Sequence, residues 1–396
     1  MSRKVVVTGL GVISAMGMGV EQNIHALQAG KTGIGSIRHL KTRLRDEFVL
    51  GEVNYSNVEL RAQVGIDPDE LVSRTSLLAF FAGKEAIKMS GLSSEEIKSC
   101  AVISGTTVGG MDLTEQIDDF QSEKNLRNIL SLHSCGDSTE KLAKFLGAEG
   151  FVTTYSTACS SAANAIMLGV RLIKSGRADR VIAGGTDALS CFTLNGFNSL
   201  MILDRNHCRP FDRSRAGLNL GEGAGFIVLE AENVAKPDKI LAFLSGYANS
   251  NDAHHQTASS PEGIGASLSM QKAMDIAGVS CGDISYINAH GTGTPNNDSS
   301  EARAIANLFA PHVPAFCSSK AFTGHTLGAC GGIEAVFSVM SIVNQELYAG
   351  LNFSISDEDI DICPISQNRI AEVNHVLSNS FGFGGNNSSL IFSKYQ

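Results

Sequence analysis

In the 396-residue sequence we find no apolar run of the roughly 18 to 20 residues that a membrane-spanning helix needs. Its opening, MSRKVVVTGLGVIS, contains no long apolar stretch followed by a cleavage site, which is the pattern of a secretory signal. Charged residues make up 18% of the chain and hydrophobic residues 43%, so one or two compact domains can bury a large core. We therefore expect a cytoplasmic protein with no membrane partner.

Runs of basic residues and paired cysteines are also missing. The net charge is -9 and no lysine or arginine run reverses it locally, so we expect no nucleic-acid partner. The nine cysteines lie between Cys100 and Cys363 without a CxxC pair, which argues against a disulfide framework and against a zinc site. We expect reduced thiols, no metal and no resident cofactor.

Glycine, in contrast, is abundant. Many of the 41 glycines stand beside short β-branched or aliphatic runs, a pattern of tight turns between strands and helices. The predicted fold class is α/β. The candidate buried strands are Lys4–Thr8, Ala101–Ser104, Arg180–Ala183, Gly225–Leu229, Ile240–Leu244, Ser285–Asn288, Ala315–Ser318, His375–Ser378 and Leu390–Phe392.

Two apolar segments predict buried helices in corresponding places. Ser160–Lys174 is apolar on nearly every face and stops at Ser175 and Gly176, and Gly328–Gln345 repeats that character further along. This similarity indicates a weak internal duplication. The polar segment 233–239, which contains Pro237, is the best linker. We therefore predict two similar halves, residues 1–236 and 237–396, with a site at their junction.

Cys159 is the first candidate for chemistry. It precedes the predicted buried helix directly, so its sulfur should lie near the positive end of the helix dipole, which favours a thiolate. A single cysteine is more often an inert buried side chain, so composition alone does not make Cys159 a nucleophile. The small neighbours Ala158, Ser160 and Ser161 strengthen the case, because a substrate can reach the sulfur.

Two histidines lie in matching glycine-rich loops. His290 stands in INAHGTGTPNND after a predicted strand, and His325 stands in SSKAFTGHTLGACGG before an apolar helix. Histidines on loops held by a rigid scaffold are better catalytic candidates than helical ones, although either could simply hydrogen-bond its own turn. The other eight histidines lack such surroundings and are expected to be structural. The segment NSFGFGGNNSS, Asn379–Ser389, could expose a backbone N–H to a reacting carbonyl or could be a plain hairpin turn.

Taken in order along the chain, these segments resemble the elongating β-ketoacyl-acyl-carrier-protein synthases, types I and II, of the thiolase superfamily. The resemblance rests on VVVTGLGVIS, STACSS, RPFDRSRAGLNLGEGAG, NAHGTGTPNND, SKAFTGHTLGACGGIEA and NSFGFGGNN. It implies a duplicated thiolase fold with αβαβα layers. It also implies that Cys159 is the acylated nucleophile and that His290 and His325 complete a Cys-His-His triad.

The same resemblance implies roles for further residues. Lys320 and Glu334 match the pair that supports the second histidine. Thr292 and Thr294 match the residues that hydrogen-bond the pantetheine arm of the carrier protein. The backbone N–H groups of Cys159 and Phe383 match the oxyanion hole, and Phe383 matches the gating phenylalanine. Val108 and Phe197 fall at positions that line the acyl pocket, where a valine leaves room for a medium, long or unsaturated chain.

The implied activity is a decarboxylative Claisen condensation, in which an acyl group on Cys159 is extended with malonyl-carrier. Thiolates attack thioesters readily, and two neutral histidines can each donate a hydrogen bond to an enolate oxygen. The substrates arrive on phosphopantetheine of an acyl carrier protein. The pathway can be fatty-acid, type II polyketide or aryl-polyene synthesis. We expect a homodimer, with a heterodimer as the alternative.

Competing assignments come from the same superfamily. Type III synthases and chalcone-type enzymes carry Cys-His-Asn sets and thiolases carry Cys-His-Cys, whereas the GFGGNN loop here has no cysteine. A non-catalytic chain-length-factor-like partner subunit would lack the nucleophile, so the intact set of groups disfavours this alternative.

Carrier docking is where the sequence departs from the family. Type II synthases carry a basic cluster where this chain has GIDPDELVSRTSLLAF, which offers only Arg74. Four arginines further on could supply positive potential for the carrier instead, or could equally form internal ion pairs. They are Arg205, Arg209, Arg213 and Arg215.

Overall fold

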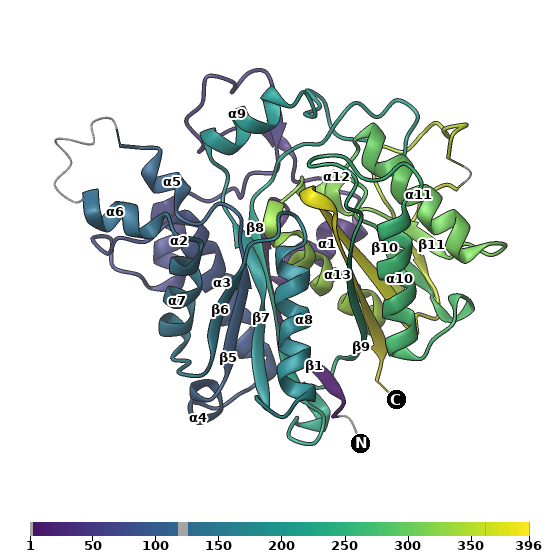
Figure 1. Cartoon of the computed structure of the whole chain (residues 1–396). Coiled ribbons are helices and arrows are strands. Elements are labelled where there is room, and N and C mark those ends of the chain that lie inside the picture. The colour runs from purple at the N-terminus through teal and green to yellow at the C-terminus, as the bar shows by residue number, and fades with distance from the viewer. Residues whose placement is uncertain (1–2, 118–125, 361, 396) are drawn as a thin grey trace.

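A computed structural model describes residues 3–117, 126–360 and 362–395 of the chain (Figure 1). Eleven strands form one large mixed sheet, and helices cover it from outside and from within. The helices are α1 (Val20–Gln28), α2 (Asn57–Val64), α3 (Arg74–Ser90), α4 (Ser94–Lys98), α5 (Met111–Thr114), α6 (Leu126–Leu132), α7 (Cys135–Leu146), α8 (Ser161–Lys174), α9 (Cys191–Ser199), α10 (Ile264–Ala277), α11 (Pro295–Phe309), α12 (Lys320–Thr323) and α13 (Cys330–Asn344).

The two halves of the sheet have the same strand order. The first half runs β6-β5-β7-β8-β1 and the second runs β11-β10-β14-β15-β9. In each half the first three strands run parallel, and the fourth strand is antiparallel to both of its neighbours. These strands are β1 (Val5–Ser14), β5 (Ala101–Gly105), β6 (Val152–Tyr155), β7 (Arg180–Asp187), β8 (Gly223–Ala231), β9 (Ala242–Asn251), β10 (Tyr286–Asn288), β11 (Ala315–Cys317), β14 (His375–Gly382) and β15 (Asn386–Lys394).

The halves meet along β1 and β9, where Val6 pairs with Phe243 and Val7 with Ala242. The predicted division after residue 236 falls in the connection between β8 and β9, and it stays a prediction. Five two-residue strands complete the structure: β2 (Gly17–Met18), β3 (Gly35–Ser36), β4 (Val49–Leu50), β12 (Glu346–Leu347) and β13 (Arg369–Ile370).

The helices form three layers around the two half-sheets, as Figure 1 shows. Helix α3 packs outside β1 and β8, helix α10 packs outside β9 and β15, and α8 and α13 pack against each other between the halves. This is the αβαβα order expected for a thiolase fold. Every residue of β8 is buried because helices cover both of its faces, which explains its continuous apolar sequence.

Glycine permits the closest contact between the central helices and the sheet. A Cβ added at Gly225 of β8 would lie 2.3 Å from the backbone nitrogen of Ile333 and 2.4 Å from the carbonyl carbon of Gly332. No larger residue fits there without moving the helix. The N-terminal end of α13 therefore lies directly on the strand.

One helical stretch corrects the expectation that no segment reaches spanning length. Leu327–Asn344 has 18 residues and a mean hydropathy of 1.5, which satisfies the length and composition of a membrane-spanning helix. In the structure 83% of this segment is buried between the two half-sheets. Its length and apolar composition are therefore those of the central helix of a protein core.

The nine predicted strands all occur, usually with longer bounds. The tenth long strand of the sheet, β6, was missed because VTTY is short and half polar. It lies at the edge of the sheet and its residues are only partly buried, so it carries no apolar run. Both predicted helices occur, and a short 3-10 turn, Leu327–Ala329, leads into α13.

Candidate active site

Cys159 lies in a strained turn immediately before α8. Ala158 has φ of 52°, a left-handed conformation that is unusual for a residue with a side chain, and Ser160 is the N-cap of the helix. The turn directs the thiol to the junction of the two halves, where its residue is 6% exposed. The sulfur is therefore sheltered yet close to the N-terminal end of a buried helix.

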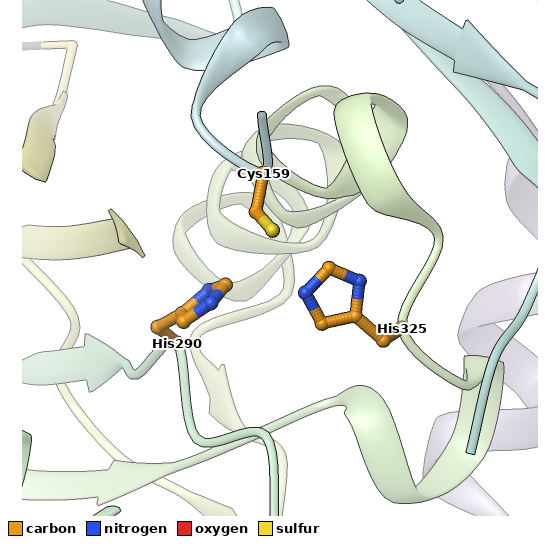
Figure 2. Close-up of side chains that lie close together, drawn as sticks. All are labelled: Cys159, His290 and His325. Carbon is orange, nitrogen blue, oxygen red and sulfur yellow. The ribbon is translucent and has the colours of Figure 1, made fainter. Parts of the chain in front are cut away.

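The structure brings Cys159, His290 and His325 together. The sulfur and one ring nitrogen of each histidine lie within 4.8 Å of one another, and the two rings stand nearly perpendicular with centroids 5.5 Å apart. Figure 2 shows both rings turned toward the space below the sulfur. The three side chains come from the start of α8, the end of β10 and the turn before α13, so tertiary packing alone unites them.

The backbone of His290 is held in place by Glu301. The carboxylate of Glu301, on α11, accepts hydrogen bonds from the N–H groups of His290 and Gly291, each at 2.8 Å. Asn379 donates to the same carboxylate at 3.1 Å. Burial raises the pKa of Glu301 to about 7, although these donors oppose the rise. The position of the imidazole thus depends on a buried acid.

The His290 ring is kept neutral by its surroundings. Burial, followed by the positive charge of Lys320, holds the pKa of His290 well below its ordinary value. The residue is 1% exposed, and no group in the described part of the chain hydrogen-bonds its Nδ1 atom. A neutral imidazole in a closed site is suited to donating or accepting one hydrogen bond from a substrate.

The tautomer of His325 follows from its own turn. Its Nδ1 atom accepts a hydrogen bond from the N–H of Leu327 at 3.0 Å, so in the neutral ring the proton belongs on Nε2. The thiol of Cys330 also lies 3.6 Å from Nδ1. Figure 2 shows the opposite ring nitrogen facing the sulfur of Cys159. His325 therefore presents an N–H donor to the cavity.

Lys320 and Glu334 form an ion pair behind the histidines. The lysine Nζ donates to the glutamate Oε1 at 2.5 Å, and the side chains are 1% and 3% exposed. Burial alone lowers the pKa of Lys320, but the Glu334 carboxylate outweighs it and raises that pKa above its ordinary value. The lysine is thus a fixed positive charge beside His290.

The same three side chains have the composition of a metal site, yet the hydrogen bonding does not fit one. A metal ligand must offer a lone pair, whereas the His325 nitrogen that faces the sulfur carries the ring proton. Binding a metal there would require the Leu327 N–H bond to break. The site is better suited to donating hydrogen bonds to an oxygen, and the expected absence of a metal stays a prediction.

A cavity of about 340 Å³ leads to the triad from one side. Thr292 and Thr294, the predicted pantetheine contacts, line it, and their hydroxyl groups are 2.8 Å apart. Asp298, on α11, accepts a hydrogen bond from the N–H of Gly293 at 3.1 Å and so fixes the loop between them. The cavity is also lined by Cys159, His290, His325 and Phe383.

A second cavity, of about 410 Å³, opens on the other side of Cys159. Val108 and Phe197, the predicted acyl-pocket residues, line it together with Phe383. The rings of Phe197 and Phe383 stack at 5.9 Å with an interplanar angle of 16°, and both rings line both cavities. The stacked pair therefore stands between the two spaces.

Three of the five arginines named above are held in ion pairs with acids that are buried or nearly so. Arg74 is 7% exposed and binds Glu222, so it offers no charge for docking, and the segment lacks the family's basic cluster entirely. Arg215 is 5% exposed and binds Asp357. Arg209 binds the buried Asp204 at 3.0 Å.

The two remaining arginines are accessible. Arg205 is 70% exposed and pairs with Glu47 at 3.3 Å, and Arg213 is 55% exposed and pairs with Glu358 at 3.5 Å. Such surface pairs are weak, so a partner can replace them.

Sequence reasoning missed several acids that shape the site. Glu301 and Asp298 hold the His290 loop, and their spacing of three residues on a helix that starts with Pro295 was a usable signal. Asp187 was also missed. It accepts hydrogen bonds from Thr107, from the N–H of Val108 and from the N–H of Gly328, so it joins the acyl-pocket loop to the turn after His325.

Comparison with known families and structures identifies this arrangement. Residues 2–235 match the beta-ketoacyl synthase N-terminal domain and residues 241–354 match the C-terminal domain. The 3-oxoacyl-[acyl-carrier-protein] synthase 2 of Staphylococcus aureus (strain COL) is 34% identical over 416 aligned residues, which cover 100% of this chain and 99% of the relative. The corresponding synthase of Vibrio cholerae is 33% identical, with 99% of each chain covered.

Solved structures agree. A chain of the ishigamide ketosynthase/chain length factor superposes with a TM-score of 0.91 at 31% identity, covering 100% of both chains. A chain of the complex of ketosynthase ApeO with its chain length factor ApeC, from Xenorhabdus doucetiae, gives 0.84 at 32% identity, covering 99% of this chain and 98% of that one. These likenesses confirm the predicted fold class. The chain belongs to the beta-ketoacyl synthase family.

Proposed function

We propose that this β-ketoacyl synthase extends an acyl group held on Cys159 by decarboxylative condensation with a malonyl group delivered on acyl carrier protein. Family membership makes the chain a ketosynthase and acyl carrier protein its partner. The observation that carries the assignment of residues is the meeting of one thiol and two histidine nitrogens within 4.8 Å at the junction of two cavities.

Acyl transfer comes first. The thiolate of Cys159 attacks the carbonyl carbon of an acyl-carrier thioester, and the bond from that carbon to the pantetheine sulfur breaks. The pantetheine leaves as a thiolate and takes up the proton that the Cys159 thiol released. The oxyanion formed on the way needs donors, for which we propose the backbone N–H groups of Cys159 and Phe383. Removing one such donor typically costs about 3 kcal/mol in transition-state stabilisation. The acyl chain then occupies the cavity lined by Val108 and Phe197.

Decarboxylation follows in the emptied entrance cavity. Malonyl-carrier enters past Thr292 and Thr294, and its thioester oxygen accepts hydrogen bonds from His290 and from Nε2–H of His325. The bond to the carboxylate breaks, carbon dioxide leaves, and the electron pair becomes an enolate. The enolate carbon attacks the acyl carbonyl on Cys159, and the thiolate departs as the lengthened β-ketoacyl-carrier forms.

The proposal involves no resident metal or cofactor, because both phosphopantetheine arms arrive with the substrates. It also places the chain in the cytoplasm. All nine cysteines are free thiols, a state that a reducing compartment preserves.

Purified protein supplied with acyl-carrier and malonyl-carrier tests the roles. Wild type should show ping-pong kinetics with release of carbon dioxide, and Cys159→Ala should abolish elongation. His290→Ala and His325→Ala should abolish malonyl decarboxylation while Cys159 can still be acylated to some extent. Elongation by Cys159→Ala, or unchanged decarboxylation in both histidine variants, would refute the assignment.

A non-catalytic partner subunit is the competing function, and the complete triad disfavours it. Two similar structures contain a ketosynthase together with a chain length factor, so the oligomer is a second open point. We propose a homodimer, with pairing to a related subunit as the alternative. Iodoacetamide should label Cys159, and acyl-carrier should protect it. No labelling would restore the partner-subunit assignment.

Carrier docking is proposed to use the accessible Arg205 and Arg213. Replacing both with glutamate should raise the apparent KM for the carrier substrate but not for a small thioester mimic. Equal effects on the two substrates would reject the docking role.

The length of the acyl chain and the pathway can be determined by mass spectrometry of carrier-bound products made from a set of acyl primers.

A further inference from the structure

Asn386 occupies an unusual position next to the nucleophile turn. It begins β15 directly after the Phe383–Gly385 turn. Its side-chain oxygen lies within hydrogen-bonding distance of three donors: Ser160 Oγ at 2.7 Å, Asn164 Nδ2 at 3.0 Å and Asn249 Nδ2 at 2.8 Å. One amide oxygen thus collects contacts from the start of α8 and from β9.

The cluster around Asn386 is polar, sheltered and uncharged. Ser160 is fully buried and Asn164 is 7% exposed. Ser388 closes the group, because its hydroxyl donates to Asn164 Oδ1 at 3.0 Å and accepts from Asn249 Nδ2 at 3.0 Å. A sheltered network whose members satisfy one another is rigid and fixes the relative positions of the segments that carry it.

The two turns that the cluster joins are also in backbone contact. A Cβ added at Gly382 would lie 2.9 Å from the carbonyl oxygen of Thr157 and 3.2 Å from the backbone nitrogen of Cys159. The proposed oxyanion donors, the N–H groups of Cys159 and Phe383, therefore come from segments far apart in sequence that touch across the junction of the two halves. Their separation must stay fixed for both to reach one oxygen.

We propose that Asn386 is the positioning residue of the oxyanion hole, holding the Phe383 turn in register with the Cys159 turn through Ser160, Asn164 and Asn249. This inference rests on the proposed function. Asn386 acts through the two turns and touches no reacting atom, so its loss should weaken steps that create an oxyanion and spare steps that do not.

The test separates three reactions in purified protein with intact carrier proteins. Acyl transfer from acyl-carrier to Cys159 requires the oxyanion hole, whereas alkylation of Cys159 by iodoacetamide and decarboxylation of malonyl-carrier do not. Asn386→Leu keeps the size of the side chain and removes the acceptor. It should lower the ratio of acyl transfer to alkylation about 100-fold, with decarboxylation within about twofold of wild type.

Asn386→Asp is the matched variant, because its carboxylate can accept from the same three donors. It should restore most of the ratio of acyl transfer to alkylation that the leucine variant loses. Because both reactions use the Cys159 thiolate, a change in thiol reactivity caused by the new carboxylate cancels in this ratio. Asn344→Leu, at the far end of α13, is the general control and should leave the ratio unchanged. If Asn386→Leu does not fold, Asn249→Leu removes one of the three donors to Asn386, together with the contacts of Asn249 to Asn164 and Ser388, and should lower the ratio about 10-fold.

The outcomes are decisive in both directions. An unchanged ratio in the leucine variant overturns the proposal, as does an equal loss in all three reactions or a failure of the aspartate to recover acyl transfer. A selective loss that the aspartate restores supports it. A wild-type protein that alkylates at Cys159 but accepts no acyl group would instead overturn the proposed function.

Discussion

The turn that carries the nucleophile and the loops that carry the histidines are held in place by different kinds of side chain. Around Cys159 the fixing groups are hydroxyls and amides, namely Ser160, Asn164 and Asn386. Around the histidines they are buried ionisable side chains: Glu301, Asp298 and the pair of Lys320 with Glu334. The two halves share a strand order yet use different chemistry at the same place in the fold.

The difference follows from what each group must do. In the proposed cycle Cys159 passes between thiol, thiolate and thioester, and a full charge beside it would favour one of these states over the others. The histidines must stay neutral donors throughout. Burial and the fixed cation next to His290 lower the pKa of its ring, and the backbone N–H donated to Nδ1 of His325 fixes the orientation of that ring. Charge is used where a protonation state is to be held constant.

The largest expected effect comes from breaking the ion pair. Lys320→Met leaves Glu334 buried without its counter-charge and should lower the free energy of unfolding by about 3 to 5 kcal/mol. Asn164→Leu, at the neutral turn, serves as the comparison and should cost less. Urea unfolding measures both.

A double variant sharpens the same point. Lys320→Met with Glu334→Leu replaces the pair by apolar side chains and should be more stable than Lys320→Met alone, because no unpaired charge remains. A double variant as unstable as the sum of the two singles would show that packing, and not charge, dominates there.

Glu301→Gln tests the raised pKa of this buried acid through the pH dependence of the free energy of unfolding. Burial raises the pKa of Glu301 to about 7, above about 4.3 in an unfolded chain. The folded protein therefore binds more protons between these values, and this contribution to stability is lost as pH rises through 7. Relative to the glutamine variant, wild type should lose up to about 3 kcal/mol between pH 4.5 and 7. A difference that does not vary with pH would contradict a raised pKa.

His290→Asn should show the opposite pH dependence of stability. Because burial and Lys320 hold the pKa of His290 well below its ordinary value, the unfolded chain gains a proton below about pH 6.5 that the folded chain does not. Wild type should lose stability relative to the variant as pH falls, by at most about 2 kcal/mol at pH 5. Urea midpoints at pH 7.5, 6.0 and 5.0 would show it, and a constant difference would count against a neutral, shifted imidazole.

The smallest expected effect is at the strained turn. Ala158 has a left-handed backbone, so Ala158→Gly relieves strain while increasing the freedom of the unfolded chain, and the two nearly cancel to within about 1 kcal/mol. Ala158→Val, which adds a branched side chain at the same backbone angle, should destabilise clearly. Equal stability of the two variants would show that the turn tolerates a relaxed conformation.

Prediction from the sequence worked best where a local signal exists. Strands such as β8 could be predicted because a strand buried on both faces needs a continuous apolar run. Helix α8 could be predicted because a helix stop signal follows its last apolar turn. Edge strand β6 had no such run. The sequence could not show that Arg74 is buried in an ion pair, because its partner, Glu222, lies far along the chain and only the fold brings the two charges together.

By itself, the sequence determined the fold class, the family resemblance and the order of the reactive residue types, because glycine spacing and apolar periodicity are local properties of a chain. Only the tertiary structure decided which nitrogen of His325 faces the thiol, which arginines are exposed, and that Asn386 reaches across the junction. Those depend on side chains from different elements meeting at distances near 3 Å, and no local pattern encodes such a meeting.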